Sequence, residues 1–129
     1  MRGAIVSVIT ALHDSIPGVR CVRRIGDTFE LVMQDGTTRA PTAAELLAPV
    51  QAERIAAINA ECRSRLLARY GPAEEQVSRA IGVYGAQEQT DMQAGIAATI
   101  DASNVAQNSV LAAADIAAVE AVSVSWPVI

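Results

Sequence analysis

Residues 19–40 read VRCVRRIGDTFELVMQDGTTRA, and this stretch decides the fold of the first third of the chain. Runs of apolar and β-branched residues are separated by Gly26-Asp27 and Asp35-Gly36. Two-residue links of this kind favour tight hairpins because Gly and Asp tolerate positive φ angles. The pattern predicts a three-stranded antiparallel meander, with strands over residues 19–25, 28–34 and 37–40.

Alternation along these strands predicts which side chains share a face. One face of the first strand should carry Val19, Cys21 and Ile25, and one face of the second should carry Phe29, Leu31 and Met33. The opposite face should be solvated, with Arg20, Arg24, Glu30 and Gln34.

The segment before the meander has apolar residues at helical spacing, namely Ile5, Val8, Ile9, Leu12 and Ile16. This spacing predicts a helix over about residues 3–15 that covers the dry face of the sheet. The β-branched content makes a strand the alternative. The apolar run is too short to span a bilayer, and it lacks the cleavage site of a signal peptide, so we interpret it as part of the fold.

The pattern becomes helical after Pro41. Thr42-Ala43-Ala44-Glu45 is a capping-box sequence. A long helix to Tyr70 should follow, with Pro49 either kinking it or starting a new helix. The apolar stripe of this helix is Ile55, Ile58, Cys62 and Leu66, and Glu61 and Arg65 are spaced to pair across one turn.

Gly71-Pro72 predicts a stop and a restart. A shorter helix should run from Pro72 to about Tyr84, with an apolar face of Ala73, Val77, Ala80, Ile81 and Tyr84, and Gly85 should close it. Thr90-Asp91-Met92-Gln93 resembles a second capping box, so the next helix should extend from there to about residue 113.

That helix has small residues on one side, where a neighbouring helix could approach closely: Gly95, Ala98, Ala102 and Ala106. Asp115 can cap a last short helix to about Ala121. The residues after it alternate between apolar and polar, which predicts an extended strand or docking arm. The expected fold class is α+β. Residues 1–41 form a head with one helix and the meander, and residues 42–129 form a helical region with an extended C-terminal arm.

The composition limits the classes of function. Hydrophobic residues make up 51% of the chain and aromatic residues 3%, so alanine supplies much of the core, and a partner chain would add stability. All ten basic residues are Arg, and residues 81–129 carry five acidic residues and no base. An acidic C-terminal third repels phosphate, so we expect no nucleic-acid partner. Cys21 and Cys62 lie far apart in sequence, so we expect free thiols.

The residues of catalytic chemistry are sparse. His13 is the only histidine, and with Cys21 or Ser15 it is the only conceivable start of a triad. Glu74 and Glu75 lie at the start of a predicted helix, where carboxylates offset the helix dipole. We therefore expect no enzymatic activity, no cofactor, no metal site and no membrane association.

The sequence favours a role in protein binding over a role in catalysis. The polar run from Ser103 to Ser109 would set register and oligomer number if it lay inside a bundle. Trp126 in the apolar tail is the best interface anchor, with packing on the chain's own core as the alternative. Arg20 and Arg24 suit an acidic partner surface, with a simple solvated face as the alternative. The candidate interface residues are Trp126, Val124, Val128, Met92, Ile96, Ile100, Arg20 and Arg24.

Four sequence segments carry a resemblance to a known class of protein. They are Ile58-Asn59-Ala60-Glu61-Cys62, Tyr70-Gly71-Pro72-Ala73-Glu74-Glu75-Gln76, the predicted helix with Met92, and Val124-Ser125-Trp126-Pro127. Their order over roughly residues 50–129 resembles small accessory proteins encoded in the tail-fibre gene region of tailed bacteriophages. The resemblance implies a structural component of the virion tail, made in the bacterial cytoplasm.

Such a component would dock on a tail fibre, a baseplate or copies of itself through its helical faces. A tail-fibre assembly chaperone and a small bacterial adaptor unrelated to phage are the alternatives. The resemblance implies other tail proteins as partners, with copies of the chain itself as a second candidate, and it brings no defined functional residues.

Overall fold

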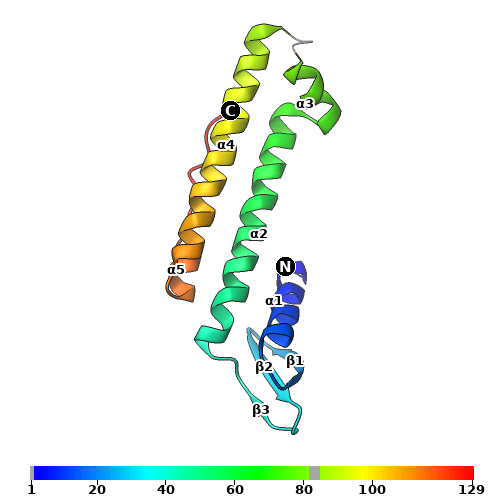
Figure 1. Cartoon of the computed structure of the whole chain (residues 1–129), viewed down its shortest axis with the longest axis vertical. Coiled ribbons are helices and arrows are strands. Elements are labelled where there is room, and N and C mark those ends of the chain that lie inside the picture. The colour runs from blue at the N-terminus through cyan, green and yellow to red at the C-terminus, as the bar shows by residue number, and fades with distance from the viewer. Residues whose placement is uncertain (1, 82–84) are drawn as a thin grey trace. The chain divides into compact units, whose positions relative to one another are not determined.

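The computed structural model describes the backbone of residues 2–81 and 85–129, and the side chains of residues 8–72, 74–78, 81 and 85–129. The elements follow the order α1 (Arg2–Ser15), β1 (Val19–Ile25), β2 (Thr28–Met33), β3 (Thr38–Arg39), α2 (Ala43–Tyr70), α3 (Ala73–Ala80), α4 (Ala86–Ala112) and α5 (Ile116–Glu120) (Figure 1). The strands form one antiparallel sheet in the order β1-β2-β3. The predicted α+β class is therefore confirmed.

The chain divides into two compact units. The first unit comprises residues 2–54 and Ala113–Ala121, and the second comprises the described residues of Ile55–Ala112 and Val122–Ile129. Helix α2 supplies residues to both units. The division of the chain after residue 41 stays a prediction.

The first unit has a core of branched aliphatic side chains between α1 and the sheet. Its buried members are Val8, Leu12, Ile16, Val19 and Leu31. Val22, Phe29, Met33 and Leu46 pack against this cluster and are partly buried. Val8, Leu12 and Ile16 of the predicted stripe thus cover the sheet as expected, whereas the side chain of Ile5 lies outside the described residues. Each fully buried side chain contributes about 1.5–3 kcal/mol to folding.

The face assignment of β1 is wrong after its first residue. Val19 pairs with Met33, but the next residue in register with β2 is Cys21, so Arg20 forms a bulge. A bulge shifts the alternation by one residue. Consequently Val22 rather than Cys21 points to the core, and Cys21 and Ile25 are exposed.

The two hairpin loops differ in length. The first is the predicted two-residue loop, because Ile25 pairs with Thr28 and Gly26 has a φ of 60°. The second has three residues, since the Met33 amide donates to the Thr37 carbonyl at 2.8 Å and the Gly36 amide donates to the Met33 carbonyl at 3.0 Å. Gly36 has a φ of 85°, which suits a turn followed by a bulge. The expected two-residue link at Asp35-Gly36 is therefore wrong, and β2 and β3 are shorter than predicted.

The capping box at the start of α2 is confirmed. The Glu45 amide donates to Thr42 Oγ1 at 3.1 Å, and the Thr42 amide donates to Glu45 Oε1 at 2.9 Å. Arg39 also donates to both carboxylate oxygens of Glu45, at 2.7 and 2.9 Å. These hydrogen bonds, the Arg39 contact first, lower the pKa of Glu45 to about 2. Pro49 lies inside α2, so it does not start a new helix.

The later helix ends agree with the sequence only in part. Gly71, with a φ of 79°, ends α2 as expected, and the Asp115 side chain caps α5 by accepting from the Ala118 amide at 2.8 Å. Helix α4 begins at Ala86, so the capping box at Thr90 is wrong, and the Thr90 hydroxyl instead donates to the Ala86 carbonyl at 3.0 Å.

The prediction for α3 also changes. The helix ends at Ala80, and Val77 and Ile81, which were expected on its buried face, are 60% and 72% exposed. The expected contributions of the Ala73, Ala80 and Tyr84 side chains to that face lie outside the described residues. Gly85 has a φ of 105° and directly precedes α4, and the Gln89 amide donates to its carbonyl at 3.1 Å.

In the second unit, α4 and residues 55–70 of α2 run antiparallel and side by side (Figure 1). Residues 122–129, here called the tail, form neither helix nor strand. The tail follows α4 in the reverse direction (Figure 1). The expected extended arm is present, but it adds no strand to the sheet.

Candidate protein-docking surfaces

The inner face of α4, here called the seam, follows a seven-residue repeat. Met92, Thr99 and Ala106 are buried at intervals of seven, and so are Ser103 and Val110. From α2, Ile58 and Tyr70 are buried at 0% and 3% exposure. A repeat of this kind is typical of helices that pack along their length. Only part of the seam is filled by large apolar side chains.

Polar side chains inside the seam are hydrogen-bonded. The Thr99 hydroxyl donates to the Gly95 carbonyl at 2.7 Å. Gln107 Nε2 donates to Asn59 Oδ1 on α2 at 2.7 Å and to Ser103 Oγ at 2.9 Å. An amide that links two helices fixes their register. The polar run predicted to set register thus contributes Ser103 and Gln107, whereas Asn104, Asn108 and Ser109 are exposed.

Gly95 allows the end of α2 to approach α4. A Cβ atom built on Gly95 would overlap the Tyr70 hydroxyl and would lie 3.5 Å from Ile129 Cγ2. The absence of a side chain at residue 95 therefore makes room for Tyr70 and for the last residue of the tail. The sequence predicted a close approach at this position, but by a neighbouring helix alone.

The tail occupies the flank of α4 that carries the other small residues. Ser123, Ser125 and Pro127 line one groove together with Ala98, Ala102 and Ala106 of α4. Further along, the last three residues of the tail, 127–129, line a second groove with Arg69, Tyr70 and Gly95. The small-residue side of α4 therefore packs against the chain's own tail.

Trp126 anchors this tail. The Arg65 guanidinium lies over the indole ring at 4.9 Å from its centroid, and Glu61 holds Arg65 through an ion pair of 3.0 Å. The predicted Glu61–Arg65 pair is confirmed. A cation over an indole contributes about 0.5–1 kcal/mol at an exposed site. Val122, Val124 and Trp126 are half-buried while Ser123 and Ser125 are exposed, so the alternation predicted from the sequence is present as far as Trp126. It is wrong beyond that residue, because Pro127 is half-buried and Val128 is exposed.

The other flank of α4 carries a partly exposed stripe of three apolar side chains and Gln107. Ile96, Ile100, Gln107 and Leu111 are separated by four, seven and four residues, so they share one side of the helix. We call this set the α4 stripe. Ile96 and Gln107 are half-buried, whereas Ile100 is 43% exposed and Leu111 is 62% exposed. In the two grooves described above, the tail residues lie with other residues of α4 than these four.

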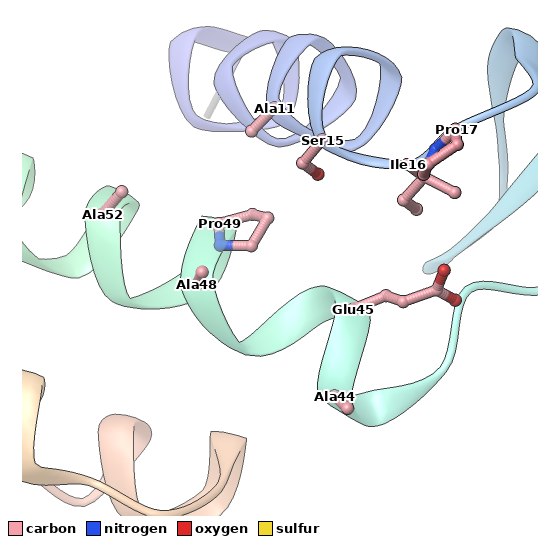
Figure 2. A pocket seen from close by; sticks show the side chains of 9 residues that line it. All are labelled: Ala11, Ser15, Ile16, Pro17, Ala44, Glu45, Ala48, Pro49 and Ala52. Atoms are coloured by element: carbon pink, nitrogen blue, oxygen red, sulfur yellow. The ribbon is translucent and has the colours of Figure 1, made fainter.

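The first unit has an apolar groove of about 440 Å³ between α1 and the start of α2 (Figure 2). Ala11 and Ser15 point toward it from α1, and Pro49 points toward it from α2. Its other lining residues are Ile16, Pro17, Ala44, Glu45, Ala48 and Ala52. The Glu45 carboxylate is already held by Arg39, so the groove offers mainly apolar contact.

The two arginines proposed as an interface do not share the solvated face of the sheet. Arg24 pairs with Phe29, so the pleat places it on the Phe29 face, and Arg20 lies in the bulge. Both are exposed. Arg23 lies on the opposite face, where it forms an ion pair with Glu30 across the strands. The bulge explains why strict alternation selected the wrong arginine.

The remaining candidate residues fall into three places. Met92 is buried in the seam and is 3% exposed. Ile96 and Ile100 belong to the α4 stripe, and Val124, Trp126 and Val128 belong to the tail, where Val128 is fully exposed. Sequence reasoning missed Leu111, although it lies eleven residues, or three helical turns, beyond Ile100.

The structure also locates the residues considered for catalysis. His13 is exposed, and its Nδ1 lies 3.3 Å from Asp14 Oδ1. Among the described residues, no three His, Cys, Asp or Glu side chains gather closely enough to hold a metal ion. In the same part of the chain, every helix is too short or too polar to cross a membrane.

Comparison of the chain with protein-family models, curated proteins and solved structures finds no match.

Proposed function

We propose that this chain is a structural protein-binding module that docks on a partner protein through the α4 stripe. The observation that carries the proposal is the pair of large apolar side chains Ile100 and Leu111, which are 43% and 62% exposed on one side of α4. Aligned apolar residues at helical spacing form the face by which an amphipathic helix binds another protein.

The seam supports the same proposal. Thr99 and Ser103 are buried at 0% and 3% exposure where large aliphatic side chains would contribute more burial. A partner helix on the α4 stripe would extend the apolar contact of the second unit. The polar seam residues would then fix the register of α2 and α4. The contact between the α4 stripe and the partner would bury the additional apolar surface that the seam does not provide.

The biological setting comes from the resemblance of residues 50–129 to tail accessory proteins of bacteriophages. We place the module in the virion tail, on a fibre, on a baseplate or on copies of itself. The test is quantitative mass spectrometry of purified particles of the phage that encodes the chain. Detection at a fixed copy number supports the proposal, and absence from the particles contradicts it. Absence combined with co-purification alongside unassembled fibre would instead favour the assembly chaperone.

The docking surface is tested by variants supplied in trans to a phage that lacks the gene. The double variant Ile100→Asp/Leu111→Asp should lower incorporation into particles at least tenfold, because two carboxylates would be desolvated at the contact. Ala97→Asp/Asn108→Asp adds the same two charges at exposed positions off the stripe and should leave incorporation unchanged. Circular dichroism and melting curves verify that each variant folds. Normal incorporation of the folded double variant would exclude the α4 stripe.

A further inference from the structure

Strand β1 is a long edge of the sheet in the first unit. It lies at one end of the order β1-β2-β3 and has seven residues, whereas β3 at the other end has two. Within the described sheet β1 is hydrogen-bonded to β2 alone. Alternate residues of an antiparallel strand point their amide and carbonyl groups to opposite sides, so about half of these groups in β1 point away from β2. An edge of this kind can accept a further strand from another polypeptide.

The side chains along this edge form a short pattern of charge. Arg23 and Arg24 are adjacent, so the pleat places them on opposite faces of the sheet, and their side chains are 57% and 45% exposed. Val22 and Ile25 flank them, and Val22 is half-buried while Ile25 is 53% exposed. Strand β1 contains no acidic residue. The edge therefore presents an apolar, two basic and an apolar residue in succession.

The acidic residues of the hairpin leave these arginines accessible. Arg23 forms its ion pair with Glu30 on the β2 side, and Arg24 Nη2 lies 3.9 Å from Oδ1 of the fully exposed Asp27. Arg20 in the bulge forms no ion pair with the part of the chain that the structure describes. Ion pairs at the surface contribute little to folding, so the two arginines are available to carboxylates of another chain.

From these observations we infer that β1 accepts an extended acidic segment of another protein as a fourth strand. The segment has the pattern apolar–acidic–acidic–apolar, aligned with residues 22–25. This pattern is the same in both directions, so it suits a parallel and an antiparallel strand. Opposite charges on neighbouring strands stabilise the pairing, and backbone hydrogen bonds to the edge supply the rest of the affinity.

This inference goes beyond the proposed function, because it concerns the first unit and does not involve the α4 stripe. The first unit does not require the added strand for its own stability, since its buried cluster already lies between α1 and the sheet. Binding at the edge and docking through α4 can therefore be tested separately.

A second copy of the chain fits this edge less well. A second β1 would bring three more arginines and no carboxylate to the same ladder, and like charges opposite one another destabilise a strand pair. The chain has one pair of adjacent acidic residues, Glu74-Glu75, and it lies in helix α3 rather than in an extended segment. A nucleic acid would be repelled by the net charge of -4 and could not pair with the backbone of β1 as a strand.

The test is the binding of a synthetic peptide to the full-length chain in reducing buffer, measured by fluorescence anisotropy. The probe is fluorescein-labelled Thr-Thr-Val-Glu-Glu-Val-Thr-Thr, and the control peptide Glu-Thr-Val-Thr-Thr-Val-Thr-Glu has the same composition with its acidic residues apart. The probe should bind at least fivefold more tightly than the control peptide. Arg24→Glu should weaken binding of the probe at least tenfold, whereas Arg63→Glu, the same charge change at an exposed position on α2, should leave it unchanged.

A second pair of peptides tests for pairing through the backbone. Each carries N-methyl groups on alternate residues of the probe, one on the odd and the other on the even positions. Only alternate amides of an added strand face β1, so one peptide should bind at least tenfold more weakly than the other. Amide resonances of β1 should shift in the nuclear magnetic resonance spectrum when the unmodified probe binds.

Three results would overturn the inference. Equal binding of the probe and the control peptide, or of the two methylated peptides, would show that charge alone holds the segment. Tighter binding of a thymidine oligonucleotide than of the probe would favour a nucleic-acid partner. Concentration-dependent shifts of β1 amides in the chain alone would make a second copy the occupant. Melting curves verify that both arginine variants fold, and Ile100→Asp/Leu111→Asp should leave peptide binding unchanged.

Discussion

The cores of the two units are built from different side chains. The buried cluster of the first unit consists of branched aliphatic residues only: Val8, Leu12, Ile16, Val19 and Leu31. The buried positions of α4 in the second unit are Met92, Gly95, Thr99, Ser103, Ala106 and Val110, of which two are large and apolar. Ile58 and Tyr70 of α2 add two large buried side chains to the second unit. Since stabilisation follows the apolar area that is buried, we expect the small and polar positions of α4 to contribute less than the aliphatic cluster of the first unit.

This difference connects composition to function. Under the proposed function, the first unit with its aliphatic core has little to gain from a partner, whereas the second unit with its small and polar seam would gain stability when another chain covers the α4 stripe. The exposed Ile100 and Leu111 belong to that stripe. Single substitutions in each unit can therefore test whether the two cores differ in how much they stabilise the fold.

The largest effect should come from Leu31→Ala in the first unit. Leu31 is 0% exposed, and the lost methyl groups would leave a cavity, so we expect a loss of about 2–5 kcal/mol in the free energy of unfolding. Ser103→Ala is the corresponding variant in the second unit. It removes one hydrogen bond of the seam, so the free energy of unfolding should fall by about 0.5–1.5 kcal/mol. Urea denaturation followed by circular dichroism measures both. If Ser103→Ala lowered the free energy of unfolding as much as Leu31→Ala or more, the proposed difference between the cores of the two units would be wrong.

Gly95→Ala should be the next largest effect. Replacing Gly by Ala inside a helix ordinarily stabilises it by about 1 kcal/mol. Here the added Cβ would overlap the Tyr70 hydroxyl, so we expect destabilisation by about 1–3 kcal/mol. The double variant Gly95→Ala/Tyr70→Phe should recover part of this loss. A stabilising Gly95→Ala substitution would show that Tyr70 does not pack against residue 95.

Thr42→Ala should have a smaller effect. It removes the acceptor for the Glu45 amide at the start of α2, which costs about 1 kcal/mol for a typical N-cap. Thr42→Ser keeps the hydroxyl and serves as the control. Thermal melting of both variants measures the effect, and identical melting temperatures would show that the cap contributes nothing.

The pH dependence contributed by Glu45 has a defined direction. Hydrogen bonds from Arg39 and Thr42 hold its folded-state pKa at about 2, below its ordinary value of 4.5. The stabilisation it contributes is therefore complete above pH 4.5 and is lost as the pH falls toward 2. Glu45→Gln should flatten the stability profile in this window. The slope that remains includes Asp35, whose pKa is lowered by the Thr37 hydroxyl and amide. An unchanged profile would contradict the assignment to Glu45.

The features that sequence predicted well are those with a local cause. The Gly26-Asp27 hairpin, the Thr42–Glu45 capping box and the Asp115 cap each depend on side chains within a few residues of the backbone that they bind. Such features follow from local stereochemistry and are visible in the sequence.

The errors arose where two local patterns compete or where distant contacts decide. The sequence VRCVRRI of β1 places an apolar Cys21 beside an apolar Val22, so it fits either face, and the bulge at Arg20 makes Val22 rather than Cys21 the residue that faces the core. Thr90 has the composition of a cap, but α4 already begins at Ala86, and its hydroxyl bonds within the helix. The position of the tail depends on Gly95 and Arg65, and no sequence rule links residues so far apart.

The central claim is that the second unit depends on another chain more than the first unit does. Native-state hydrogen exchange of the full-length chain at low concentration tests it most directly. We predict that amides of β1 and β2 are protected at least tenfold more than amides in the middle of α4, and that protection of α4 rises with protein concentration. Equal protection in α4 and in the sheet, independent of concentration, would contradict the account.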